Sequence, residues 1–211
     1  MAKNAAATKS DAQANIEATL RVGIGYGWMK VEEDTSDNGR AVLSDVFWKS
    51  LKKAFTGKHT AVERLGVKVG FSRLRASHGK IIWDSVIERI KDSDILIFDV
   101  AAAPDKDTVS GEDFDLGRIM LDMDKGKNVL NANVLVEIGA AIALGKRIML
   151  LCPYAWREFI PSDLKGYLWT FYNWRGTGRN SERCFVDEYG VQNGYIGMLR
   201  EVAEEKLGLV K

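Results

Sequence analysis

One acidic residue, Glu137, lies in an otherwise uncharged stretch that runs from residue 129 to residue 145. Alanine, glycine and branched apolar residues fill this stretch, which is typical of a helix that packs closely against another element. A carboxylate there costs free energy unless it is hydrogen-bonded, lies near a helix N-terminus or lines a cavity. A carboxylate facing the anomeric carbon of a sugar can attack that carbon or stabilise the positive charge developing on it. Glu137 is therefore the candidate catalytic residue; the structural alternative is an acid that only favours a helix start.

A glycine-rich turn, GIGYGW, follows the first expected strand. Glycine lets the backbone approach a ligand closely, and aromatic rings can stack on a base or a sugar. The turn is not the dinucleotide-binding fingerprint, because a third correctly spaced glycine and an immediate helix are missing. A plain glycine turn with surface aromatic residues is the structural alternative. The candidate substrate-binding residues of this turn are Gly25, Tyr26, Gly27 and Trp28.

Three further polar residues follow apolar runs and are expected near Glu137. Asp99 ends the run DILIFDV and would point into a crevice at the sheet edge, or would cap the following loop. Asn131 and Asn133 come just before Glu137. Asn133 is expected to be the N-cap of the helix, and Asn131 to bond either the backbone or a ligand. Asp99, Asn131 and Asn133 are therefore candidate substrate-binding residues as well.

Helix-like and strand-like patterns alternate along the chain. This alternation predicts βαβ units and a parallel sheet covered on both faces, a flavodoxin-like (Rossmannoid) three-layer α/β sandwich with about five strands. Ligands of such sheets bind outside the carboxyl ends of the strands, where the candidates above would meet. The expected strands are 20–25, 65–71, 94–100, 147–152 and 167–172, and the expected helices are 42–55, 81–90, 114–123, 133–144 and 196–206.

Length and composition predict one domain over residues 19–211, preceded by a flexible tail over residues 1–18. Lys and Arg total 30 against 29 Asp and Glu, so a basic footprint for duplex nucleic acid is missing. The sequence has no apolar run long enough for a membrane helix and no signal-peptide pattern, which predicts a cytoplasmic protein. Cys152 and Cys184 have no metal-ligand spacing and are expected to be buried free thiols. The polar region 101–130 is interpreted as an insertion that could cover a site.

Three segments together, SDILIFDV, NANVLVEIGAAIALGKRIMLLC and PSDLKGYLWTFY, resemble the nucleoside 2-deoxyribosyltransferase-like and TIR-like superfamily, which includes predicted nucleotide-binding proteins. The likeness covers roughly residues 81–172. The resemblance implies that Glu137 is the catalytic glutamate and that Asn131 and Asn133 shape the pocket beside the ribose. The Asn-Val-x-x-Glu-x-Gly-x-Ala pattern of the superfamily is matched by Asn133, Val134, Glu137, Gly139 and Ala141, and Asp99, Tyr26 and Trp28 would contact base or sugar.

The sequence departs from the superfamily pattern in three places. Ala132 replaces a proline between the two asparagines, and the insertion before Asn131 is longer than the usual turn. Asp84 is the nearest candidate for the acid that holds the nucleoside, but its spacing to Asp94 is unusual. These departures favour simple cleavage over transfer to a second base. The loop residues Arg73, Arg75 and His78 could meet a phosphate, or could form a solvated loop.

The resemblance implies a hydrolase or deoxyribosyltransferase that acts on the N-glycosidic bond of a nucleoside, a nucleotide or NAD. No cofactor or metal is expected, since NAD would be a substrate and the two histidines offer no ligand set. A homo-oligomer is expected, in which the segment 169–174 could complete a neighbouring pocket or form a buried edge strand. The alternative is a non-catalytic nucleotide sensor that reports binding by self-association. A flavin module is less favoured, because no phosphate-cradling loop follows the first strand.

Overall fold

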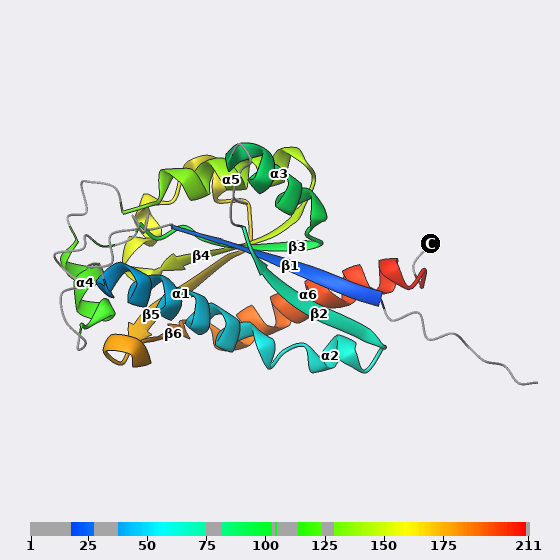
Figure 1. Ribbon diagram of the computed structural model, residues 1–211, viewed down its shortest axis with the longest axis horizontal. Helices are drawn as coiled ribbons and strands as arrows, with labels where there is room; N and C mark the ends of the chain where they lie inside the picture. Colours follow the sequence, from blue (N-terminus) through cyan, green and yellow to red (C-terminus); the bar gives the residue numbers. More distant parts are fainter. Residues whose placement is uncertain are drawn as a thin grey trace, which may run out of the picture.

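The computed structural model describes residues 18–27, 38–74, 82–102, 104, 114–123 and 129–209. Strands and helices alternate through most of the described chain, as the sequence patterns predict (Figure 1). The strands are β1 (Ala18–Tyr26), β2 (Val67–Arg73), β3 (Ile95–Asp99), β4 (Arg147–Pro153), β5 (Trp169–Arg175) and β6 (Glu182–Phe185). The α-helices are α1 (Asn38–Thr56), α2 (Thr60–Glu63), α3 (Ile82–Asp92), α4 (Leu116–Asp122), α5 (Ala132–Ala143) and α6 (Glu188–Lys206), and short 3-10 helices are η2 (Tyr154–Phe159), η3 (Ser162–Leu164) and η4 (Gly178–Asn180).

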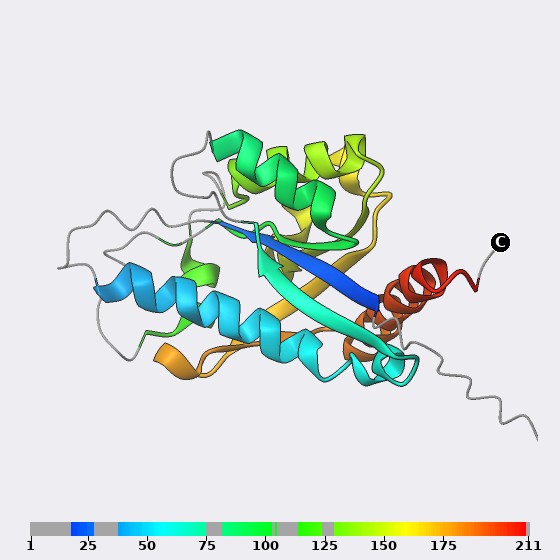
Figure 2. The same cartoon turned by 45° about the vertical axis from the view of Figure 1, so that its right-hand side comes forward.

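The strands form one six-stranded, curled sheet in the order β2-β1-β3-β4-β5-β6 (Figure 2). The first five strands are parallel, and β6 pairs antiparallel with β5. The architecture is a mixed α/β fold that is broadly Rossmann-like. The predicted strand count of about five, all parallel, was wrong because β6 is only four residues long. Its sequence, ERCF, includes two charged residues and shows no apolar run that would predict a strand.

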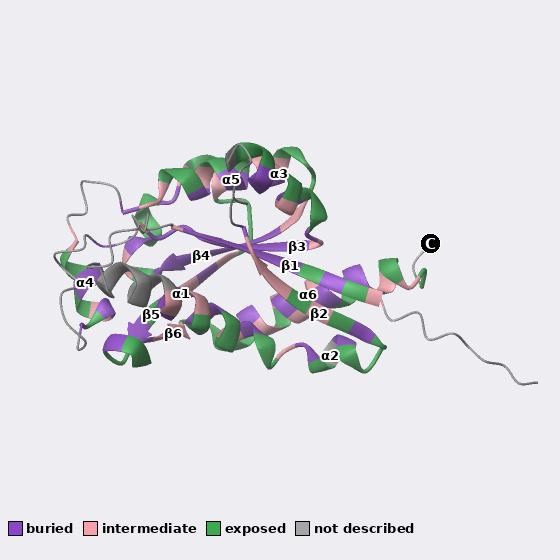
Figure 3. Ribbon diagram, in the orientation of Figure 1, coloured by how far each residue is buried: buried purple, intermediate pink, exposed green. Residues whose placement is uncertain are grey.

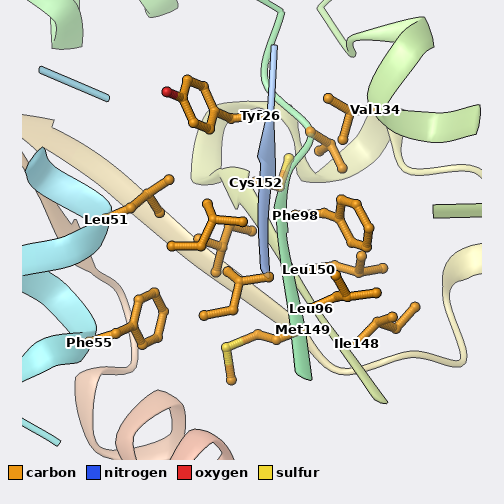
Figure 4. Packing of buried hydrophobic residues seen from close by; sticks show 14 of the residues in the cluster. Tyr26, Leu51, Phe55, Leu96, Phe98, Val134, Ile148, Met149, Leu150 and Cys152 are labelled. Atoms are coloured by element: carbon orange, nitrogen blue, oxygen red, sulfur yellow. The ribbon is translucent and has the colours of Figure 1, made fainter. Parts of the chain in front are cut away.

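Helices cover both faces of the sheet (Figures 1 and 2). The helices α3 and α5 pack on one face, and α1 and α6 pack on the other. The central strand β3 is buried at all five positions, which agrees with the four apolar residues that precede Asp99 and with cover from both sides (Figure 3). Side chains of the central strands alternate between the two helical layers: Phe98 and Leu150 point toward α5, whereas Tyr26 points toward the α1 side (Figure 4).

The two cysteines are free thiols, as expected, but they differ in burial. Cys152 is fully buried, and burial raises the pKa of its thiol far above the ordinary value. Cys184 on β6 is only half-buried, because it lies on an edge strand. In the described part of the chain, no helix has the length and apolar character that a membrane crossing requires.

Candidate active site

The helix α5 begins at Asn131, which lies at the edge of the sheet formed by the carboxyl ends of the parallel strands. The Asn131 side-chain oxygen accepts hydrogen bonds from the backbone N–H groups of Asn133 and Val134, at 3.0 and 3.2 Å. The expectation that Asn133 caps the helix was wrong. Asn131 has the extended backbone (φ −77°, ψ 112°) that precedes a helix, whereas Asn133 lies inside the first turn and is exposed.

Glu137 lies in the second turn of α5, on the face that packs against the sheet. It is only 6% exposed, and its neighbours on that helix face, Val134, Ile138 and Ala141, are also buried. Among the described residues, no group hydrogen-bonds its Oε2 atom. Loss of hydration raises the pKa of Glu137 from 4.5 to about 7. A helix dipole would lower this pKa, so burial outweighs the electrostatic advantage of a helix start.

Two glycines of β1 and the turn after it allow α5 to lie this close to the sheet. A Cβ atom on Gly25 would lie 2.9 Å from Oε2 of Glu137 and 2.5 Å from the Phe98 ring. A Cβ atom on Gly27 would lie 2.7 Å from Nδ2 of Asn131. The structure therefore places Gly25, Gly27, Asn131 and Glu137 together at the carboxyl end of β1. We call these four residues the Glu137 cluster.

Tyr26 and Asp99 lie on the other face of the sheet. They are opposite each other in the register of β1 and β3, and both side chains point toward α1 rather than α5. The Tyr26 ring stacks with the Phe47 ring of α1 at a centroid distance of 6.4 Å. Asp99 accepts hydrogen bonds from the Tyr172 hydroxyl and the Arg183 guanidinium. The structure therefore divides the predicted site residues between two layers of the fold.

Arg183 is the main residue that sequence reasoning missed. Its side chain is fully buried, and it forms an ion pair with Asp99, 84 positions earlier in the chain. The only sequence signal is Asp99 itself, because an acid that ends a buried strand needs a compensating cation. The sequence contains 30 Lys and Arg residues and gives no reason to choose Arg183 among them.

The other predicted residues occupy separate positions. Asp84 is exposed in the first turn of α3, and Asn133 is exposed on α5. The Arg73 guanidinium lies over the Trp48 ring, 4.5 Å from its centroid. Trp28, Arg75 and His78 lie outside the described residues. A substrate contact by any of these residues stays a prediction.

Two cavities lined by described residues lie away from Glu137. One, of about 460 Å³, lies between α1, β6 and α6 and is lined by Lys53, Lys58, Arg175 and Glu182 among others. The other, of about 210 Å³, lies between α4, β5 and the start of η2. Within the described ranges, no group of three His, Cys, Asp or Glu side chains could hold a metal ion.

No family model matches the sequence, and no curated protein matches it. Among solved structures, the chain is similar to a 2-deoxyribosyltransferase from Bacillus psychrosaccharolyticus, with 15% identity, a TM-score of 0.34, and coverage of 73% of this chain and 86% of that chain. It is also similar to a β-glucosidase from Erythrobacter marinus, with 9% identity, a TM-score of 0.28, and coverage of 67% of this chain and 20% of that chain. A third similar structure is pro-sf-caspase-1, with 12% identity, a TM-score of 0.27, and coverage of 92% of this chain and 82% of that chain. Similarities at these scores establish neither a family nor an activity.

Proposed function

We propose that the protein cleaves the N-glycosidic bond of a nucleoside, a nucleotide or NAD, with Glu137 as the catalytic carboxylate. One observation carries the proposal: the Oε2 atom of Glu137 is buried, has no hydrogen-bond partner among the described residues, and lies beside the backbone of Gly25. The cluster lies at the carboxyl ends of the parallel strands, which is the edge where open α/β sheets bind ligands. A buried acid with a raised pKa at such an edge is a typical feature of a functional site.

The chemistry follows from the protonation state of Glu137. With a pKa of about 7, roughly half of the molecules carry the ionised carboxylate at neutral pH. The carboxylate attacks the anomeric carbon, the bond to the base nitrogen breaks, and the base leaves with the bonding electron pair. A nucleoside base then takes a proton from solvent, whereas the nicotinamide of NAD leaves as a neutral molecule and needs none. Water then hydrolyses the glycosyl ester, which releases the sugar and restores the carboxylate. A second base in place of water would give transfer instead of hydrolysis.

The rest of the cluster has positioning roles in this proposal. Gly25 and Gly27 allow α5 and the carboxylate to lie close to β1, and Asn131 holds the start of α5. The predicted contacts of Trp28, Asp84 and Asn133 with the base or the sugar remain part of the proposal, whereas Tyr26 and Asp99 are buried on the opposite face of the sheet and are left out of it. Neither step needs a cofactor, and NAD would be a substrate.

Product analysis tests the proposal directly. Purified protein is incubated with NAD and a panel of nucleosides and nucleotides, and released base is quantified by chromatography. We expect release of base from at least one compound, and a loss of at least about a hundredfold in Glu137→Gln. Glu158→Gln, which changes an exposed acid, is the matched control and should keep full activity. No release of base from any compound would rule the proposal out.

A non-catalytic nucleotide-binding module that reports binding by self-association is the second candidate. It is favoured by the state of Asp99, because protein donors already bond both oxygens of this predicted substrate contact. In that case calorimetry would detect binding of an intact nucleotide, mass spectrometry would find no split product, and Glu137→Ala would change affinity alone.

A further inference from the structure

Arg183 on β6 has an elaborate set of buried contacts. Its Nε and Nη2 atoms donate to Oδ2 of Asp99 at 3.0 and 2.5 Å, and its Nη1 atom donates to the Phe47 carbonyl of α1 at 3.0 Å. The guanidinium lies between aromatic rings, with centroid distances of 4.7 Å to Phe47, 5.1 Å to Tyr172 and 4.3 Å to Trp174. Arg183 thus connects α1, β3, β5 and β6 through one side chain.

A buried ion pair is weak evidence for stability, because desolvation of both charges offsets their attraction. The position of Asp99 suggests what the pair does instead. Asp99 is the last residue of β3, and its Oδ1 atom accepts the backbone N–H of Ala101 at 3.1 Å. The Tyr172 hydroxyl contacts the same carboxylate at 2.9 and 3.0 Å. The pair therefore fixes the direction in which the chain leaves the sheet.

The segment that leaves β3 pairs with the segment that immediately precedes α5. The Val100 carbonyl accepts the backbone N–H of Asn131 at 2.8 Å, and the Val129 carbonyl accepts the N–H of Ala102 at 2.8 Å. Between these bonds, Ala101 and Leu130 form an antiparallel bridge. Asn131 is the N-cap of α5, so residues 99–102 determine where the helix begins.

We propose that Arg183 is a positioning residue, which through Asp99 holds residues 99–102 in the conformation that seats the Asn131 cap and places Glu137 against Gly25. Arg183 acts from the opposite face of the sheet and does not touch the proposed substrate. Its importance for catalysis rests on the proposed function, but the position of Glu137 can be measured without any assay of activity.

The test measures the titration of Glu137 by NMR of protein with carbon-13-labelled glutamate, with Glu137→Gln used to assign the resonance. The main variant replaces both partners, Asp99→Leu with Arg183→Met, so that no buried charge is left unpaired. We expect the pKa of Glu137 to fall by at least one unit from its value of about 7, because α5 moves and hydration of the carboxylate returns. Lys53→Met with Glu182→Leu removes an exposed ion pair between α1 and β6 and should leave the titration unchanged.

Arg183→Lys is the second variant if the double replacement does not fold. Lysine keeps the buried positive charge but cannot bond Asp99 and the Phe47 carbonyl as a planar fork does. We expect a smaller decrease of the Glu137 pKa in the same direction. A Glu137 titration that stays at about 7 in folded protein of either variant would overturn the proposal.

The two proposals fail in distinguishable ways. If the protein releases base from a substrate, the double variant should lose at least tenfold in kcat with little change in KM, and its pH–rate profile should shift toward acid. If no substrate is cleaved, the proposed function fails and the NMR titration still tests the positioning role. Unchanged kcat in a folded double variant would overturn the positioning role alone.

Discussion

Glu137 makes the stability of the protein depend on pH in a direction opposite to that of most acids. Its pKa is about 7 in the folded state against 4.5 for an exposed glutamate. The folded state therefore favours the protonated form of Glu137. The contribution of this residue to the free energy of unfolding is fully present below pH 4.5 and is lost as pH rises through 7. The total loss is at most about 3 kcal/mol.

Replacement by glutamine removes this penalty. We expect Glu137→Gln to be more stable than the unmodified protein by up to about 3 kcal/mol at pH 9, and equally stable at pH 4. Urea unfolding over this pH range measures the difference. A variant that gains nothing at pH 9 would show that the carboxylate is hydrated in solution. Loss of stability at a site kept for function is a common trade-off.

Gly25 tests how closely the carboxylate approaches β1. A Cβ atom at this position would lie 2.5 Å from the Phe98 ring and 2.9 Å from Glu137 Oε2, so both must move. We expect Gly25→Ala to lose about 1–3 kcal/mol in thermal or urea unfolding. Gly70→Ala is the matched control, because Gly70 lies in the strand β2 with open space around it. Equal effects of the two substitutions would contradict the close approach.

The helix α5 depends on its cap, and the two neighbouring asparagines provide an internal comparison. The Asn131 side chain bonds two backbone N–H groups, whereas Asn133 is exposed in the first turn. We expect Asn131→Ala to cost about 1 kcal/mol, and Asn131→Asp to keep most of the stability because it keeps the acceptor. Asn133→Ala should have little effect on unfolding. A larger loss from Asn133→Ala than from Asn131→Ala would restore the capping role that the sequence suggested.

The strand β6 has a larger role than its length suggests. It is a four-residue antiparallel edge strand, yet it supplies Arg183 to the Asp99 ion pair. Its backbone also donates a hydrogen bond to α1, from the Arg183 N–H to Ser50 Oγ at 2.9 Å. Edge strands are usually short and carry charged residues, which weakens their sequence signal. A buried ion pair can thus come from an element that periodicity alone does not detect.

At the scale of the whole molecule, local patterns predicted most of the fold. The alternation of apolar runs located β1 to β5 and the helices α1, α3, α4, α5 and α6, because each buries a periodic face. The grouping of Gly25, Gly27, Asn131 and Glu137 also followed from the rule that the carboxyl ends of parallel strands share one edge. The period of two along a strand already implies that Tyr26 cannot face the same way as Gly25 and Gly27.

Contacts between distant parts of the chain were beyond sequence reasoning. The partners Asp99 and Arg183 are 84 positions apart, and His59 and Tyr195 are 136 apart. Neither pair has a spacing that periodicity can detect, since each depends on how whole layers pack. The two pairs also differ in kind: one is a charged pair at the carboxyl edge, and the other is a neutral pair that connects α2 and α6.

The His59–Tyr195 pair predicts a loss of stability in mild acid. His59 is 3% exposed, its Nε2 atom lies 3.0 Å from the Tyr195 hydroxyl, and its ring packs on Phe71. Burial lowers the pKa of His59 below 6.5 and outweighs the attraction of Glu63. The unfolded chain therefore binds a proton that the folded protein resists, so stability is present above pH 6.5 and falls as pH drops below it.

Unfolding by urea between pH 7.5 and 5.5 measures this loss, whose slope cannot exceed about 1.4 kcal/mol per pH unit for one group. Glu137 has the opposite slope over the same range, so the comparison is made in the Glu137→Gln protein, where that contribution is absent. There, His59→Gln should flatten the pH dependence, because glutamine cannot take up a proton and can still meet the Tyr195 hydroxyl. A slope that persists after His59→Gln would assign the acid sensitivity to another group, and would mean that the contact between α2 and α6 tolerates a charged imidazole.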